Sequence, residues 1–275
     1  MKTFLRWPGN KQRYLKHLLP MVPLEFNTYY EPFLGSGALF LYLQPSSWVL
    51  NDKNKDIIHL WNTVKNETSK IITQLKYIAS YINKLSNEQK IIYCKKITAS
   101  LNNREFDTKR ASIFLAMIMC AYMGHIFVKN RYVFKTLEEK LFRNKPLYFS
   151  KQQYHHLLTE ISMFLNDSKG SIHNKDYKEI MKKAKSEDFV FLDPPYIETH
   201  DYQFNYVKDE NIKQDFIHEL LNEVEKLNTR NVKWLMTQAD TPFVRKMFEK
   251  YNIHSFKVFR LQGNCYKKEL IIKNY

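Results

Sequence analysis

Four consecutive apolar residues, Phe189 to Leu192, constrain the fold of this chain more than any other segment. An unbroken apolar run of this length, bounded by turn residues, is typical of a strand buried on both faces. It is followed at once by Asp193-Pro194-Pro195-Tyr196. Proline has a fixed φ and no N–H to donate, so the strand must end there. The segment therefore predicts a buried strand that ends in a rigid, acidic turn.

The chain on both sides of this segment alternates predicted strands and helices. Before residue 65, strands are expected over residues 28–32 and 47–51, and helices over residues 11–19, 38–43 and 54–64. After residue 152, strands are expected over residues 189–192, 232–237, 253–260 and 269–272, and helices over residues 211–227 and 242–251. This alternation is the pattern of an α/β fold whose parallel sheet is connected by helical crossovers.

Residues 65–147 have a different character, with helical periodicity and very few glycines. Ser86 and Gln89 predict a capping box at the start of one helix, and Asp107 is expected to cap the next. Residues 127–134 predict a hairpin around Asn130 with basic residues near its tip. We therefore expect an inserted helical subdomain that carries a basic hairpin.

The net charge favours an anionic partner. Forty-three Lys and Arg residues against 28 Asp and Glu give a formal charge of +15. Nucleic acid is the first expectation and an anionic membrane surface the second, while a solvated lysine-rich surface is the alternative. No basic amphipathic helix with an aromatic face stands out, so a membrane-surface protein is disfavoured.

Cysteine usage and hydropathy indicate a soluble, intracellular protein without a metal site. The three cysteines, Cys94, Cys120 and Cys265, are scattered, and no two have the spacing of metal ligands. The first seven residues are too short and too charged for a signal peptide. The longest apolar run, near residues 111–123, is shorter than the roughly 20 residues that a membrane span needs.

Three motifs suggest chemistry on a flat base and a nucleoside. Asp193 and the Pro194 carbonyl offer two rigid acceptors to an exocyclic amine, and Tyr196 offers a face for stacking, although an ordinary turn would use the same residues. Gly35 and Gly37 lie between a strand and a helix, where a ligand can approach the backbone, or where a tight turn needs glycine. Asp52 follows the next strand and suits the hydroxyls of a ribose, or alternatively caps a helix.

These segments, in this order, resemble the Dam-type DNA adenine-N6 methyltransferases, which use S-adenosylmethionine. The similar segments are residues 4–11 (FLRWPGNK), 31–37 (EPFLGSG), 51–52 (ND), 176–177 (DY), 193–196 (DPPY), 237–245 (TQADTPFVR) and 268–275 (KELIIKNY). The resemblance implies a Rossmann-like, seven-stranded methyltransferase sheet with an inserted helical DNA-recognition subdomain. It places the catalytic domain at residues 1–64 and 150–275, and the insertion at residues 65–149.

The resemblance also implies roles for individual residues. The catalytic residues implied are Asp193, Pro194 and Tyr196. The cofactor-binding residues implied are Trp7, Lys11, Phe33, Gly35, Gly37, Asp52, Asp176, Tyr177 and Asp193. The residues expected to contact nucleic acid are Lys129, Asn130, Arg131, Lys135 and Arg143. In the family this hairpin reads the target, usually through Arg-Lys-Gly-Glu-Phe-Asn-Val-Pro, and the different residues here leave the target sequence open.

The expected function is therefore site-specific methylation of the N6 amine of adenine in double-stranded DNA, with the base flipped into the site. The expected state is a monomer or a weak dimer on DNA. The alternatives are an RNA adenine-N6 methyltransferase, a cytosine-N4 methyltransferase, which more often has serine in place of Asp193, and a catalytically inactive nucleic-acid-binding relative.

Overall fold

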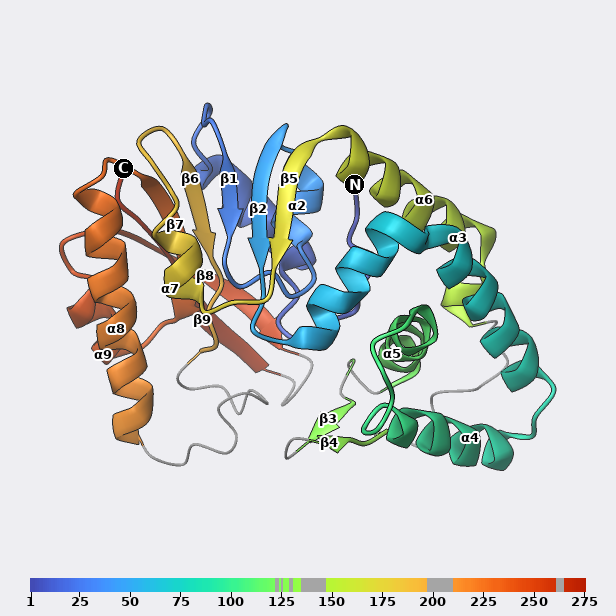
Figure 1. The fold of residues 1–275 in the computed structure, drawn as a ribbon. Helices are drawn as coiled ribbons and strands as arrows, with labels where there is room; N and C mark the ends of the chain where they lie inside the picture. Colours follow the sequence, from blue (N-terminus) through green and yellow to red (C-terminus); the bar gives the residue numbers. More distant parts are fainter. Residues whose placement is uncertain (122–123, 125, 129–130, 135–146, 197–209, 261–264) are drawn as a thin grey trace. The chain divides into compact units, whose positions relative to one another are not determined.

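The computed structural model describes residues 1–121, 124, 126–128, 131–134, 147–196, 210–260 and 265–275 (Figure 1). They form two compact units. The helical unit comprises residues 1–12, 35–44 and 54–172. The sheet unit comprises residues 13–34, 45–53 and 173–275.

A seven-stranded sheet has the strand order β5-β2-β1-β6-β7-β9-β8 (Figure 1). Its strands are β1 (Tyr29–Glu31), β2 (Ser47–Asn51), β5 (Lys169–His173), β6 (Phe189–Leu192), β7 (Lys233–Ala239), β8 (Asn252–Arg260) and β9 (Cys265–Lys273). Strands β1, β2, β6 and β7 pair in parallel, whereas β9 runs antiparallel to both β7 and β8. This confirms the predicted α/β fold with seven strands.

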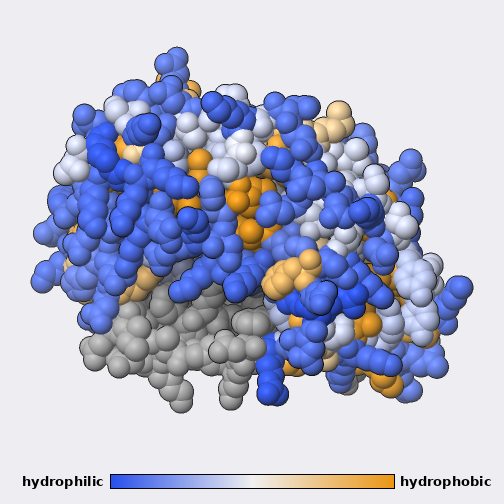
Figure 2. All heavy atoms as spheres, viewed as in Figure 1, coloured by the Kyte–Doolittle hydropathy of each residue, from blue (hydrophilic) through white to orange (hydrophobic). Residues whose placement is uncertain are grey.

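Three helices cover one face of this sheet: α7 (Tyr177–Met181), α8 (Glu210–Asn228) and α9 (Pro242–Met247) (Figure 1). Alternate residues of the strands face them, because side chains on one face recur every second residue. Ile180, Leu220 and Val244 pack in one core cluster with Val190 and Trp234. The outer surface over α8 is hydrophilic (Figure 2). All four residues of β6 are buried, which confirms the prediction from the apolar run.

The helical unit contains five α-helices among its described residues: α2 (Ala38–Leu43), α3 (Lys55–Asn83), α4 (Asn87–Ser100), α5 (Thr108–Cys120) and α6 (Gln152–Asp167). The predicted caps are confirmed, because Ser86 and Gln89 form the capping box of α4 and Asp107 accepts from the Arg110 N–H at the start of α5. The hairpin strands β3 (Phe127–Val128) and β4 (Arg131–Tyr132) pair antiparallel, as predicted.

Helix α3 is much longer than the expected helix over residues 54–64. It continues to Asn83 through a kink at Glu67, whose φ of −136° and ψ of 32° are not helical. The carbonyl of Lys65 accepts hydrogen bonds from Ser162 Oγ (2.9 Å) and Asn166 Nδ2 (2.8 Å) of α6. Side chains that bond the carbonyl of a helical residue open its hydrogen-bond ladder and kink it. The helix therefore bends where α6 supplies other partners.

The helix expected over residues 11–19 is replaced by three shorter elements. These are the 3₁₀ turn η1 (Lys11–Arg13), the short helix α1 (Leu15–Leu18) and the 3₁₀ turn η2 (Leu19–Met21). Tyr14 separates the first two with φ of −106° and ψ of 0°. Pro20 lies in η2 and has no N–H for a helical ladder, so a continuous helix does not form there.

The boundaries between the two units differ from the predicted domain boundaries. The predicted boundary at residues 64 and 65 falls inside α3, and residues 150–172, assigned to the catalytic domain, belong to the helical unit. The functional assignment of the two domains stays a prediction. Within the described residues, no helix combines the length and the apolar character that crossing a membrane requires.

Candidate active site

In the sheet unit, acidic residues gather where parallel strands end. Glu31 is the last residue of β1, Asp52 follows β2 and Asp193 follows β6. Because β2, β1 and β6 run parallel, these ends lie at one edge of the sheet. In open α/β sheets this edge is where ligands bind. The predicted residues Asp52 and Asp193 are thus brought to the same edge.

Asp193 is held by a threonine of the neighbouring strand. Thr237, fully buried in β7, donates its hydroxyl to Asp193 Oδ1 at 2.6 Å. Strand β7 pairs with β6 with Met236 opposite Leu192, so Thr237 lies one residue further along, beside Asp193. A short hydrogen bond to a carboxylate is stronger than one between neutral groups. Thr237 therefore fixes the orientation of the Asp193 carboxyl group.

Tyr196 is held by a buried acid, Glu269. Its hydroxyl donates to Glu269 Oε2 at 3.0 Å, and Glu269 belongs to β9. Burial, and next the charge of Glu269, raise the pKa of Tyr196 well above its usual value, so the phenol stays protonated. Only 4% of Tyr196 is exposed. A base can therefore stack on its ring only after neighbouring atoms move.

Glu31, the acid at the end of β1, is held by a tyrosine of its own strand. The hydroxyl of Tyr29 donates to Glu31 Oε2 at 2.8 Å, and both residues are buried in β1. Burial, then Glu31 and then Asp193 raise the pKa of Tyr29 well above its usual value. Because β1 and β6 are parallel neighbours, the acids at their ends lie on adjacent strands.

The loops after β2 and β5 are joined by asparagine side chains. Asn51 donates to the carbonyls of Pro32 (3.0 Å) and Lys175 (3.1 Å) and accepts from the Lys175 N–H (2.9 Å). Asn174 donates to the carbonyl of Asp52 at 2.8 Å. These bonds fix the backbone on both sides of Asp52, whose side chain is buried.

Asp176 and Tyr177, two of the predicted cofactor-binding residues, have different environments. Asp176 is exposed and caps α7 by accepting from the Lys178 N–H at 2.9 Å, which is a structural task. Tyr177 is buried, and its ring lies 5.1 Å from that of Phe33 at an angle of 32°. The structure thus brings Phe33 and Tyr177 together as an aromatic pair.

In the helical unit, Trp7 and Gly35 are in close contact. A Cβ atom added to Gly35 would lie 3.1 Å from Trp7 Cδ1, and Gly35 has a φ of +46°. Gly37 begins α2 with a φ of +58°. Both positive φ values favour glycine. The buried Lys11 donates from Nζ to the carbonyl of Gly9 at 3.0 Å. The structure thus brings Trp7 against Gly35, while Lys11 is held by the carbonyl of Gly9 in the segment that carries Trp7.

Two observations fit a nucleoside cofactor with an amino-acid tail. The buried Tyr177 hydroxyl has no hydrogen-bond partner among the described residues, and a buried hydroxyl without a partner is costly. A polar group of a bound ligand would supply that partner. The turn at Gly35 and Gly37, both with positive φ, has no side chain of its own that would keep a ligand from its backbone, and the Cβ position of Gly35 is filled by Trp7.

Three residues that bond the residues of this edge were not among the predicted site residues: Thr237, Glu269 and Glu31. Their signal was a polar residue inside an apolar strand, as with Glu269 before Leu270. Of the residues predicted to contact nucleic acid, Lys129, Asn130, Lys135 and Arg143 lie outside the described residues, and Arg131 is exposed on β4. The described part of the chain contains no cluster of three or more metal-ligating side chains.

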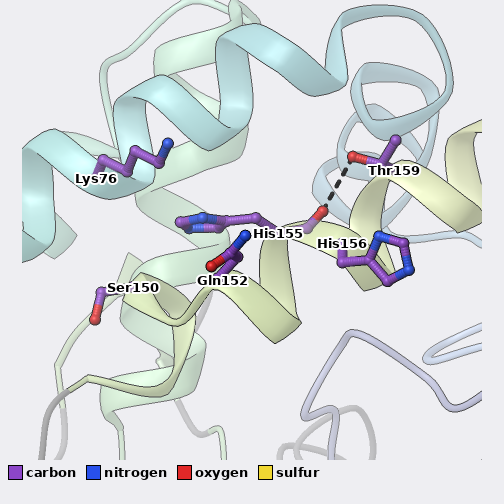
Figure 3. Close-up of a pocket in the computed structure, with 6 residues that line it drawn as sticks. All are labelled: Lys76, Ser150, Gln152, His155, His156 and Thr159. Atoms are coloured by element: carbon purple, nitrogen blue, oxygen red, sulfur yellow. Dashed lines mark hydrogen bonds between the residues drawn. The ribbon is translucent and has the colours of Figure 1, made fainter.

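A surface pocket of about 400 Å³ in the helical unit is lined by none of the predicted site residues (Figure 3). Its lining residues are Lys76, Ser150, Gln152, His155, His156 and Thr159. Several of their polar atoms already have partners in the protein. Thr159 donates to the His155 carbonyl, Ser150 donates to the Leu147 carbonyl, and His155 Nε2 bonds the Phe149 carbonyl. We assign no ligand to this pocket.

Comparison with known proteins agrees with the geometry. Residues 7–261 match the family model of the D12 class N6 adenine-specific DNA methyltransferases. The type II methyltransferase M1.LlaDCHI of Lactococcus lactis subsp. cremoris is 24% identical over 281 residues, covering 100% of this chain and 96% of the relative. The type II methyltransferase M.MjaIII of Methanocaldococcus jannaschii is 26% identical, covering 100% of this chain and 99% of the relative. The DNA adenine methylase of Escherichia coli K12 is 24% identical, covering 94% and 88%. The chain therefore belongs to the D12 class of N6 adenine-specific DNA methyltransferases, enzymes that methylate adenine in DNA.

Proposed function

We propose that this enzyme transfers a methyl group from S-adenosylmethionine to the N6 of an adenine flipped out of double-stranded DNA, with Asp193 and Pro194 as the acceptors for the amine. The observation that carries the proposal is the Asp193 carboxyl group at the end of β6, fixed by the hydroxyl of Thr237 at 2.6 Å. An acid held in this way is prepared for a ligand before the ligand arrives, which is the form of electrostatic preorganisation that accelerates reactions.

The amine of adenine is a poor nucleophile because its lone pair is conjugated with the ring. Asp193 and the Pro194 carbonyl would each accept a hydrogen bond from one N–H group of the amine and draw both hydrogens out of the ring plane. The lone pair then concentrates on nitrogen. Pro194 is buried, and the following Pro195 restricts its ψ as its own ring restricts its φ, so few directions are open to its carbonyl. Most of the acceleration comes from position and fixed charge, without a covalent enzyme intermediate.

The residues that would hold the methyl donor divide by chemistry. Gly35 and Gly37 leave backbone for the amino-acid tail, and Lys11 offers a cation for its carboxylate. Asp52 would accept from the ribose hydroxyls. Phe33 and Tyr177 would contact the adenine ring with their aromatic faces, and the orphan hydroxyl of Tyr177 would gain a partner. When bound, the donor supplies an electrophilic methyl group on a positively charged sulfur.

The basic hairpin, with Arg131 exposed on β4, would contact DNA, and the net charge of +15 would attract the DNA phosphates. Phosphate contacts release counterions, so binding should weaken steeply as salt rises. The target base is paired inside a duplex and must leave the stack before the acceptors can reach it. Tyr196, whose ring Glu269 holds through the hydroxyl, would then lie beside the base.

The test is transfer of labelled methyl to unmethylated DNA and to matched RNA, read as N6-methyladenine by nucleoside mass spectrometry. Asp193→Asn should lower the rate by about 10²–10³-fold, as loss of one fixed electrostatic contact does. Its matched control is Asp188→Asn, because Asp188 is a buried acid just before the same strand, and its carboxyl group accepts from the N–H groups of Thr28 and Lys185 and interacts with Tyr30.

The outcomes separate the alternatives. Label in DNA, lost in Asp193→Asn and kept in Asp188→Asn, supports the proposal. Label in RNA alone would replace the substrate and keep the chemistry. No label in either nucleic acid, together with tight DNA binding, would instead support an inactive nucleic-acid-binding relative.

A further inference from the structure

A buried ion pair joins the first turns of α3 and α5. Arg110 donates from Nε to Asp56 Oδ1 at 2.6 Å and from Nη2 to Asp56 Oδ2 at 3.1 Å. The two side chains are 7% and 8% exposed. Forked contact of this kind fixes both distance and orientation. The pair belongs to none of the groups assigned above to cofactor, amine or phosphate.

The same arginine holds the segment that connects α4 to α5. Its Nη1 donates to the carbonyls of Leu101 (2.6 Å) and Arg104 (2.5 Å), and its guanidinium lies 4.4 Å from the centre of the Phe106 ring. Arg110 therefore contacts Asp56 of α3 and three residues of the segment that connects α4 to α5. It links α3, the connecting segment and its own helix.

The third member of the cluster is Tyr132 of the hairpin strand β4. Its hydroxyl donates to Asp56 Oδ2. Its backbone is held as well, because its N–H donates to Asn102 Oδ1 at 2.8 Å and its carbonyl accepts from Asn102 Nδ2 at 3.3 Å. Both the side chain and the backbone of this one residue are thus tied to the helices, and we call Asp56, Arg110 and Tyr132 the anchor cluster.

The anchor cluster determines which side chains the hairpin presents. Along β4 and the next two residues, Tyr132 (7% exposed) and Phe134 (4%) are buried, while Arg131 is exposed and Val133 is 45% exposed. Side chains alternate between the two faces of a strand, and a slip by one residue would exchange the faces. Because the Tyr132 side chain is buried on one face of the strand, Arg131 and Val133 are exposed on the other face.

A buried ion pair is weak evidence for stability, because desolvation of both charges offsets their attraction, and its best-attested role is to specify one arrangement over others. We propose that the anchor cluster positions the hairpin for target recognition, fixing the register of β4 so that Arg131 meets DNA in one orientation. This inference rests on the proposed role of the hairpin in contacting DNA. Asp56, Arg110 and Tyr132 are positioning residues, since they act through the exposed face of β4.

The test compares Tyr132→Phe with Tyr154→Phe in the full-length enzyme. Each substitution removes one buried hydroxyl that donates a hydrogen bond within the helical unit, since Tyr154 donates to the Phe4 carbonyl at 2.8 Å. The measured quantity is the ratio of kcat/KM for the preferred site to kcat/KM for sites with one base changed. Tyr132→Phe should lower this ratio about tenfold, which corresponds to 1.4 kcal/mol of lost discrimination. Tyr154→Phe should leave it unchanged.

Asn102→Ala gives an independent perturbation. Asn102 is exposed, so its loss does not open the core, yet it removes both bonds to the Tyr132 backbone. It should lower discrimination in the same direction, with binding of S-adenosylmethionine unchanged. Equal ratios in Tyr132→Phe, Asn102→Ala and the wild type would overturn the inference while wild-type methylation of a defined site still stands. A wild-type enzyme that methylates no DNA would instead remove the proposed function, and the inference with it.

Discussion

Replacement of Thr237 by valine tests how much of the chemistry depends on the orientation of Asp193. Valine keeps the branched shape of threonine and removes the hydroxyl that donates to Asp193 Oδ1 at 2.6 Å. Because Thr237 is fully buried, water does not readily replace the lost donor. Hydrogen bonds to charged groups contribute about 1.5–3 kcal/mol. If the whole amount is realised in the transition state, kcat falls about 10- to 150-fold.

The assay is single-turnover methyl transfer to a DNA duplex that contains the preferred site. The affinity for S-adenosylmethionine, measured by calorimetry, separates an effect on the chemical step from an effect on donor binding, because Asp193 is also among the implied cofactor-binding residues. Thr63→Val is the matched control, since Thr63 is also buried and donates to a backbone carbonyl, that of His59, at 2.7 Å. A Thr237→Val enzyme as fast as Thr63→Val would refute the idea that the hydroxyl orients the catalytic acid.

Three further predictions concern binding and stability. Gly35→Ala should weaken S-adenosylmethionine binding in calorimetry more than Gly9→Ala does, because both residues have a positive φ but only the Cβ added at Gly35 meets Trp7, at 3.1 Å. Gly9→Ala, with φ of +79° and no atom within 4 Å of the new Cβ, tests backbone strain in the segment that carries Trp7 and Lys11. Thr98→Val should raise the unfolding free energy by about 1 kcal/mol in urea, because its buried hydroxyl has no partner among the described residues. Burial lowers the pKa of His155 from 6.5, so the unfolded chain binds the proton more readily. Stability should therefore fall as the pH drops through about 6.5, and His155→Gln should flatten that part of the urea-unfolding profile.

Local signals in the sequence were sufficient for the features that depend on neighbouring residues. The apolar run of β6 predicted a buried strand, because burial on both faces leaves no place for a polar residue. The capping box of Ser86 and Gln89 was also readable, because both partners lie within one turn of helix. The resemblance to adenine-N6 methyltransferases rested on such short segments, and the family match over residues 7–261 confirms it.

Three features that depend on distant residues were not predicted. The length of α3 was missed because the kink at Glu67 depends on side chains of Ser162 and Asn166, nearly one hundred residues later. The partner of Asp193 was missed because it requires the register of β6 against β7. In the same way, Glu269 reaches Tyr196 only because β9 returns antiparallel beside β7.

The position of β9 has a consequence for the newly synthesised protein. This strand is the last of the sheet in the sequence, yet it lies between β7 and the edge strand β8. As the chain leaves the ribosome, β8 therefore emerges before the one strand that it pairs with. Tyr196 is likewise synthesised some seventy residues before Glu269, the acid that accepts its hydrogen bond. With the role proposed for Tyr196, methylation requires β9 in place, so a nascent chain that displays residues 193–196 without β9 should be unable to methylate DNA.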